Sequence, residues 1–287
     1  MKWKAALRRI RSSVSRFSKR RRGRQRSNFV ILCRPRTGSY HLTSLLDSCP
    51  DIICHGELFK PARVELRSSH KQRIRIRRSA RRDRQPMAFI RQVRDLDPDL
   101  HFGFKLFTTH VSRVPELEKL LASRNWKLII LQRDPIETYA SSLRAKRTHI
   151  WTLKEGRSVN SDDLNTPVRF KRASLKKFAG EYNASVDLAA RLCAEKREVF
   201  VIDYSQLHDP SALNALLRFI GSRSDPHEMT SKYQKQYSGT VEDGFSNWRA
   251  LDAFVQGKRP FKATLPTTNT PAADKQNEGS SDLSRRV

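Results

Sequence analysis

The sequence predicts an α/β protein, a three-layer sandwich in which a central parallel sheet lies between two layers of helices. Short apolar runs rich in β-branched residues alternate along the chain with longer segments of helical spacing. Strands that alternate with helices need crossover connections, and these place the strands in a parallel sheet. At 287 residues the chain is long enough for one such domain with tails.

The first predicted strand, Phe29–Cys33, is a continuous apolar run typical of a buried parallel strand. The other predicted strands are Ile52–Cys54, Phe102–Phe107, Lys127–Leu131 and Val199–Ile202. The predicted helices are Ser39–Ser48, Pro115–Ala122, Pro135–Arg147, Val168–Glu195 and Ser211–Ile220. Proline at the first turn of the third helix and Gly221 after the last one are typical helix start and stop signals.

Composition divides the chain into three segments. Residues 28–258 form the predicted domain, and residues 259–287, rich in Thr, Pro, Asn and Ser, form a predicted disordered tail. Residues 1–27 carry twelve Lys and Arg and no acid. An apolar stripe from Trp3 to Phe17 leaves three interpretations open for this extension: a helix on an anionic membrane surface, a transit peptide, or a disordered basic tail.

The net charge of +28 predicts attraction to polyanions, whether nucleic acid, anionic membrane or a phosphorylated ligand. A second basic block, residues 60–94, holds thirteen Lys and Arg against Glu65 and Asp83. The chain has no apolar stretch that could span a membrane and no secretion signal. Its four cysteines have no pairing or metal-ligand spacing. We therefore expect reduced thiols, no metal and a cytoplasmic protein, with membrane association through residues 1–27 left open.

The segment Arg34–Tyr40 lies between the first strand and the first helix, where a helix N-terminus offers unpaired N–H groups and partial positive charge. Gly38 allows the backbone to approach a phosphate, Arg36 adds a charge, and the hydroxyls of Thr37 and Ser39 add hydrogen bonds. The segment therefore predicts an anion site. No Lys-Ser/Thr pair follows the glycine, so an ATP or GTP hydrolase or a kinase-like enzyme is disfavoured.

Residues 29–42 and 49–59 together resemble the opening of bacterial sulfotransferases of the nodulation-factor and lipopolysaccharide type. The resemblance implies a P-loop nucleotide-hydrolase-like sulfotransferase fold and 3′-phosphoadenosine 5′-phosphosulfate (PAPS) as donor. It also implies that the loop binds the 5′-phosphosulfate through Arg36, Thr37, Gly38, Ser39 and Tyr40.

The second signature of that family is an Arg at a strand end and a Ser eight residues later, both on the 3′-phosphate of the donor. Arg133 and Ser141 have this spacing. An Arg can form a two-pronged contact with a phosphate, although by itself Arg133 also fits a surface ion pair at a helix start. The pair follows the loop in the family's order, which favours the donor site.

A weaker similarity covers residues 201–221, and the resemblance as a whole spans about residues 28–250. Two positions depart from the family pattern. His41 replaces the Trp that stacks on adenine in cytosolic members, and Gln206 replaces a usual Glu. These departures keep open the alternative that the chain is a degenerate sulfotransferase, which acts as a binding protein and not as an enzyme.

Sulfuryl transfer needs cations on the departing phosphate and a base for the acceptor hydroxyl. Arg36 is the first candidate for the leaving oxygen and Lys105, near the end of the third strand, is the second. The resemblance favours Glu57, expected just beyond the second strand, as the base. His110 is the rival, because cytosolic members use a His beyond the third strand.

We therefore expect an enzyme that transfers sulfate from PAPS to a hydroxyl of a carbohydrate or glycolipid, by in-line attack. The basic block at residues 60–94 favours an anionic acceptor, and residues 148–167 are a candidate lid over it. The alternative is a basic polyanion- or nucleic-acid-binding protein on a degenerate sulfotransferase fold. Nucleic acid is disfavoured because the basic runs lack interleaved aromatic residues.

Overall fold

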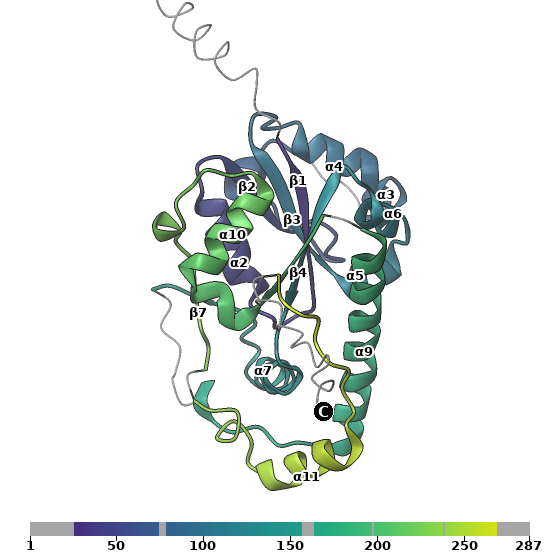
Figure 1. The fold of residues 1–287 in the computed structure, drawn as a ribbon, viewed down its shortest axis with the longest axis vertical. Helices are drawn as coiled ribbons and strands as arrows, with labels where there is room; N and C mark the ends of the chain where they lie inside the picture. Colours follow the sequence, from purple (N-terminus) through teal and green to yellow (C-terminus); the bar gives the residue numbers. More distant parts are fainter. Residues whose placement is uncertain (1–25, 75–78, 157–163, 197, 238, 269–287) are drawn as a thin grey trace, which may run out of the picture.

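The computed structural model of the protein describes residues 26–74, 79–156, 164–196, 198–237 and 239–268. Its centre is a sheet of five parallel strands in the spatial order β2-β3-β1-β4-β6 (Figure 1). The strands are β1 (Asn28–Cys33), β2 (Ile52–Glu57), β3 (His101–Phe107), β4 (Trp126–Gln132) and β6 (Val199–Asp203). Helices cover both faces, so the predicted three-layer α/β sandwich is confirmed.

The central strand β1 is apolar from Phe29 to Cys33 because it is covered on both faces. Successive side chains of a strand point to opposite faces, so a strand covered on both sides needs apolar residues at every position. Phe29 and Ile31 pack with α2 (Ser39–Ser48) and α10 (Pro210–Ile220) on one face. Val30 and Leu32 join the core on the opposite face.

The helices of that opposite face contribute Phe89, Leu117 and Leu192 to the same core as Val30 and Leu32. They are α4 (Pro86–Arg94), α6 (Glu116–Ala122) and α9 (Arg172–Glu195), and Figure 1 shows them on the side of the sheet away from α2 and α10. The two helical layers thereby bury both faces of the sheet. The ends of the strands are not covered by these layers, and a site can form there.

The remaining elements complete the described chain. They are α3 (Ser79–Arg84), α5 (Thr108–Arg113), α7 (Pro135–Thr148), α11 (Trp248–Lys258), three short 3₁₀ turns at Ser68–His70, Tyr204–His208 and Pro226–Glu228, and a two-stranded antiparallel ribbon of β5 (Leu153–Lys154) and β7 (Tyr233–Gln234). Helix α7 starts where β4 ends. The Asp134 carboxylate caps it by accepting hydrogen bonds of 2.8 Å from the backbone N–H groups of Ile136 and Glu137. This cap fixes the direction in which α7 leaves the sheet.

Four helices differ from the sequence predictions, and two boundaries differ by three or more residues. Helices α3, α4, α5 and α11 were not predicted, because each is short or Arg-rich and depends on packing rather than on local propensity. The long helix begins at Arg172 instead of Val168, whose backbone bonds Gly244 and Ser246 instead. Strand β2 continues to Glu57 instead of stopping at Cys54, since pairing with β3 extends it.

The chain remains packed beyond Lys258, where the sequence predicts a disordered tail from residue 259. The backbone N–H of Leu265 donates to Gln132 (3.0 Å), and Thr268 exchanges two hydrogen bonds with Val201. These hydrogen bonds hold residues 259–268 against the domain without requiring apolar residues at regular spacing. The sequence pattern therefore gave no sign of them, and the predicted tail began too early. The rest of that tail, the extension up to residue 25 and residues 157–163 of the candidate lid lie outside the described residues. In the described part, no helix is long and apolar enough to span a membrane.

Candidate active site

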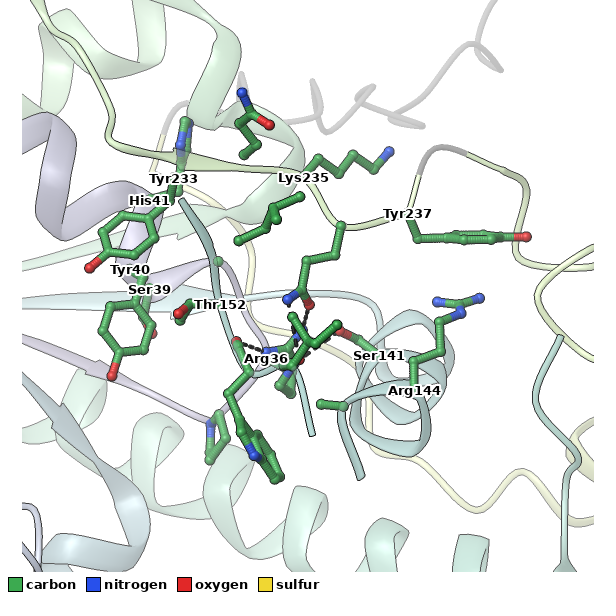
Figure 2. A pocket seen from close by; sticks show the side chains of 18 of the residues that line it. Arg36, Ser39, Tyr40, His41, Ser141, Arg144, Thr152, Tyr233, Lys235 and Tyr237 are labelled. Carbon is green, nitrogen blue, oxygen red and sulfur yellow. Dashed lines mark hydrogen bonds between the residues drawn. The ribbon is translucent and has the colours of Figure 1, made fainter. Parts of the chain in front are cut away.

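A cavity of about 640 Å³ opens at the edge of the sheet where the strands have their carboxyl ends. Most of the predicted site residues line it: Arg36, Gly38, Ser39, Tyr40, Glu57, Arg133 and Ser141. Thr37, Lys105 and His110 do not reach its surface. Parallel sheets bind ligands at this edge, so the position agrees with a ligand site. Figure 2 shows Arg36, Ser39 and Ser141 around the cavity, together with Tyr233 and Tyr237.

The loop between β1 and α2 has an unusual backbone. Gly38 has φ +83°, and a Cβ atom there would lie 2.4 Å from the ring of Tyr204, so only glycine fits. Arg36 also has a positive φ, of 73°, which is costly for a side chain of this size and typical of functional sites. The Thr37 hydroxyl donates to the Arg34 carbonyl (2.9 Å). Its proton therefore holds the loop together and is not available to a phosphate.

The Arg36 guanidinium reaches across the cavity (Figure 2). Its Nε donates to the Ser141 hydroxyl at 3.0 Å, and its terminal nitrogens donate to the Trp151 carbonyl and the Gln236 side chain. Burial, together with the nearby charge of Arg133, lowers its pKa to about 10. Arg36 is therefore still cationic at neutral pH, and it lies against the residue predicted to bind the 3′-phosphate.

Arg133 connects the end of β4 to the loop. Its Nη1 donates to the Arg36 carbonyl at 3.2 Å, and its Nε donates to Glu137 at 2.8 Å. Its guanidinium carbon lies 4.1 Å from the ring centre of Tyr204, the ring that packs on Gly38. The two motifs that are about a hundred residues apart in sequence therefore form one wall of one cavity.

Glu57 is the last residue of β2, whereas the sequence predicted it just beyond the end of that strand. The pairing of β2 with β3 shifts between His55 and Glu57, and this bulge sets the direction of the Glu57 side chain. Only 4% of Glu57 is exposed, yet the residue contributes to the lining of the cavity. One carboxylate oxygen lies 3.3 Å from the Lys105 ammonium and the other 3.5 Å from His110 Nε2.

Lys105 is completely buried behind Glu57. Its ammonium lies 3.2 Å from the ring centre of Tyr40 and 3.3 Å from a Glu57 oxygen. Burial lowers its pKa, while the charge of Glu57 acts in the opposite direction. This placement lets Lys105 neutralise Glu57 and keeps the Lys105 side chain out of the cavity lining.

His110 lies on the other side of the Glu57 carboxylate. Its Nδ1 accepts the Phe107 backbone N–H at 3.2 Å, so in the neutral ring the proton is on Nε2, which faces Glu57. Burial, with the charges of Arg113 and Lys105, lowers the pKa of His110 to about 4. Neutral His110 therefore has no free lone pair for an acceptor proton, and the geometry favours Glu57 as the base.

The carboxylate of Glu65 is a site feature that the sequence predictions missed. The Tyr40 hydroxyl lies 2.7 and 2.8 Å from the two oxygens of Glu65 and 3.2 Å from Glu57, and Lys60 lies 2.7 Å from Glu65. The Glu57 backbone N–H also donates to Glu65 (3.3 Å). A signal was present, since Glu65 is one of two acids in the basic block at residues 60–94.

Arg144 and Gln236 also line the cavity and were missed. Arg144 follows Ser141 by three residues on α7, so helical spacing could have placed both on one face. Gln236 comes from the segment after β7, about two hundred residues beyond the loop, and local sequence gives no sign that it meets Arg36.

The buried histidine gives the stability of the protein a predictable pH dependence. Below pH 6.5 the unfolded chain protonates His110, whereas folded His110 stays neutral down to about pH 4. The unfolded state then binds more protons, so the free energy of unfolding falls as pH drops through this window, by about 2–3 kcal/mol for full burial.

Urea unfolding between pH 7 and pH 4.5 measures this effect. We expect His110→Gln to lose less unfolding free energy over this range than the wild type, while replacement of exposed His227 by Gln keeps the wild-type slope. His55, whose pKa burial lowers to about 3, leaves a residual slope in every variant. Equal slopes for His110→Gln and wild type would contradict the assignment.

Comparisons with known proteins add to this geometry. No protein-family model matches the chain. Among solved structures, a sulfotransferase from Alicyclobacillus acidocaldarius covers 82% of this chain and 93% of its own length, with a TM-score of 0.45 and 16% sequence identity. In the described residues, no group of three or more His, Cys, Asp or Glu side chains is arranged to hold a metal ion.

The parallel sheet, the loop at residues 36–40 and the Arg133–Ser141 pair at one cavity form the arrangement expected of a PAPS-dependent sulfotransferase, and the relatives in sequence support this class. The sequence of the chain is similar to Nodulation protein H. The Rhizobium tropici protein is 28% identical over 244 residues, covering 81% of this chain and 88% of that protein. The Rhizobium meliloti (strain 1021) protein is 25% identical over 201 residues, covering 68% and 77%.

Proposed function

We propose that this sulfotransferase moves the sulfuryl group of PAPS to a hydroxyl of a carbohydrate or glycolipid by in-line transfer, with Glu57 as the base. The observation that carries the proposal is one cavity lined by both donor motifs and by a buried carboxylate. Its volume of about 640 Å³ lies in the range of small-molecule sites and leaves room for part of an acceptor beside a nucleotide.

The charge of the cavity suits a ligand with several phosphate groups. Glu57 is the only acidic residue among the described residues that line it. The cationic residues of the lining are Arg36, Lys60, Arg133, Arg144 and Lys235. Such an excess of positive charge around one cavity favours a polyanion. The loop residues and Arg36 would hold the 5′-phosphosulfate, and Arg133 and Ser141 the 3′-phosphate.

The transfer needs little covalent chemistry from the protein. The acceptor oxygen forms a bond to sulfur while the bond from sulfur to the bridging phosphate oxygen breaks, and the acceptor proton passes to Glu57. Arg36 and the N–H groups of the loop stabilise the charge that develops on the departing 5′-phosphate. Lys105 and His110 position Glu57 from behind, through contacts of 3.3 and 3.5 Å to its two oxygens.

Two features support a carbohydrate-bearing acceptor. Trp151 lines the cavity and is 51% exposed, so a flat indole surface is available where an acceptor enters. Tyr233 and Tyr237 add further aromatic lining. Exposed basic residues of the block at 60–94, such as Arg63 and Arg84, support an anionic group on the acceptor.

Binding of 3′-phosphoadenosine 5′-phosphate (PAP), the desulfated donor, tests the donor site. Arg133→Ala is expected to weaken PAP binding in isothermal titration by about 10- to 100-fold, as loss of a charge-assisted hydrogen bond predicts. The matched control is Arg191→Ala on the outside of α9, where Arg191 is 49% exposed and pairs with Glu118. Wild-type protein that does not bind PAP, or unchanged affinity in Arg133→Ala, would refute the donor site.

A further inference from the structure

Arg144 is a buried cation that neither donor motif includes. It lies on α7 one turn beyond Ser141, is only 8% exposed, and contributes to the wall of the cavity. Its guanidinium carbon lies 3.6 Å from the ring centre of Tyr237, and Figure 2 shows the two side chains at the same end of the cavity as Ser141.

Within the part of the chain that the structure describes, this guanidinium has no counter-charge beside it. Among the described residues no carboxylate lies within 4.0 Å of it, and its Nε is buried without a hydrogen-bond partner. Burial is the main reason why its pKa is lowered, and the charges of Arg133 and Arg147 act in the same direction while Tyr237 opposes them. Arg133, by comparison, pairs with Glu137. A buried cation without a partner destabilises the protein unless a bound anion neutralises it.

The chain makes specific room for the Arg144 side chain. A Cβ atom on Gly244 would lie 2.3 Å from Arg144 Nη2, so any larger residue there would displace the guanidinium. The backbone N–H of Gly244 is held by the carbonyls of Thr240 and Val241. The guanidinium is thus fixed between the Tyr237 ring and a turn, which leaves little rotational freedom to lose on binding an anion.

We propose that Arg144 binds the 3′-phosphate of the donor together with Arg133 and Ser141, and that it sets the requirement for a 3′-phosphorylated nucleotide. This inference rests on the proposed function. Residues three apart on a helix lie on one face, so Ser141 and Arg144 can contact the same group. A planar guanidinium can contact two oxygens of a phosphate at once. A dianionic phosphate would also supply the negative charge that the described residues do not place beside Arg144.

The sheet order separates this phosphate from the reacting centre. Glu57 ends β2, whereas α7 follows β4, and strands β3 and β1 lie between them. Three strand spacings amount to about 14 Å. Arg144 is therefore at the nucleotide end of the cavity, away from the acceptor hydroxyl and its base.

Two nucleotides that differ only in the 3′-phosphate test the proposal. Isothermal titration compares PAP with adenosine 5′-phosphate on the full chain. We expect the wild type to prefer PAP, and Arg144→Met to lose about 10- to 100-fold in PAP affinity while its affinity for adenosine 5′-phosphate changes less than about threefold. Lys146→Met, an exposed cation on the same helix, should keep both affinities.

The outcomes separate this inference from the proposed function. A wild type that binds neither nucleotide refutes both. A wild type that prefers PAP, with Arg144→Met weakening both nucleotides equally or neither, overturns only the role of Arg144 and points to an anion on the acceptor.

A stability measurement excludes simple unfolding of the variant. Removing an unpaired buried charge while keeping an apolar side chain on Tyr237 should leave the melting temperature of Arg144→Met unchanged or raise it. Arg144→Lys, which keeps the charge but not the two-pronged geometry, should retain an intermediate preference for PAP. A preference in Arg144→Lys no greater than in Arg144→Met would contradict the 3′-phosphate contact.

Discussion

Glu57→Gln is expected to lower sulfate transfer by about 10³-fold and to leave PAP affinity within about threefold of the wild type. Glutamine has the size of glutamate but cannot take a proton from the acceptor. Glu57 is 4% exposed and lines the cavity about three strands away from the 3′-phosphate wall, so its loss affects the reacting centre rather than the nucleotide. Single-turnover transfer of labelled sulfate from PAPS, to an acceptor selected from a glycan and glycolipid panel, measures the rate.

The comparison with His110→Gln identifies the base. Because the His110 lone pair accepts the Phe107 N–H, we expect His110→Gln to lose much less activity than Glu57→Gln. Glu57→Gln also leaves the Lys105 ammonium without its partner at 3.3 Å, so its melting temperature must be recorded and the assay run well below it. Transfer at the wild-type rate in Glu57→Gln, or a larger loss in His110→Gln, would remove Glu57 as base.

Arg36→Ala is expected to weaken PAP binding by about 10²-fold and to lower transfer by a further factor of about 10 to 10². The loss combines a ground-state contact with the donor and stabilisation of charge on the leaving phosphate. Backbone strain does not enter the comparison, because Arg and Ala are equally disfavoured at φ +73°. Arg36→Lys should recover part of both losses, since it restores the charge without the fork.

Arg34 provides a matched control within the same loop. Its guanidinium pairs with Glu181 and Ser185 of α9 and stacks on Phe178, on the side away from the large cavity. Arg34→Ala is therefore expected to lower the melting temperature while PAP affinity stays within about threefold of the wild type. If Arg34→Ala and Arg36→Ala weaken PAP equally, the loop acts through its overall charge and not through Arg36.

Much of the sheet followed from local pattern. A strand buried on both faces must be apolar at its buried positions, and Phe29–Cys33 and Leu128–Leu131 are such runs. Turn and cap residues such as Pro135 and Gly221 marked helix ends for reasons of backbone geometry alone. Short helices such as Pro86–Arg94 escaped prediction because tertiary packing of Phe89 and its neighbours, not propensity, stabilises them.

In the site, too, some features could be predicted from local sequence and others depend on the folded structure. The strand–loop–helix order predicted an anion site at residues 34–40, and the resemblance added Arg133 and Ser141, which the fold brings to the same cavity. Local sequence could not show that the Thr37 hydroxyl is used inside the loop, or that Lys105 lies behind Glu57. The first depends on the detailed turn of the loop backbone, and the second on a side-chain contact between segments that are distant in the chain.

The sequence by itself determined the layered α/β architecture, the phosphate loop after the first strand and the kind of ligand that loop suits, because these depend on periodicity and backbone geometry over a few residues. The tertiary structure decided which charges share the cavity. It paired Glu65 with Tyr40 and, among the described residues, placed no carboxylate within 4.0 Å of the Arg144 guanidinium. Whether a buried charge is compensated depends on every element packed around it, and that information exists only once the chain has folded.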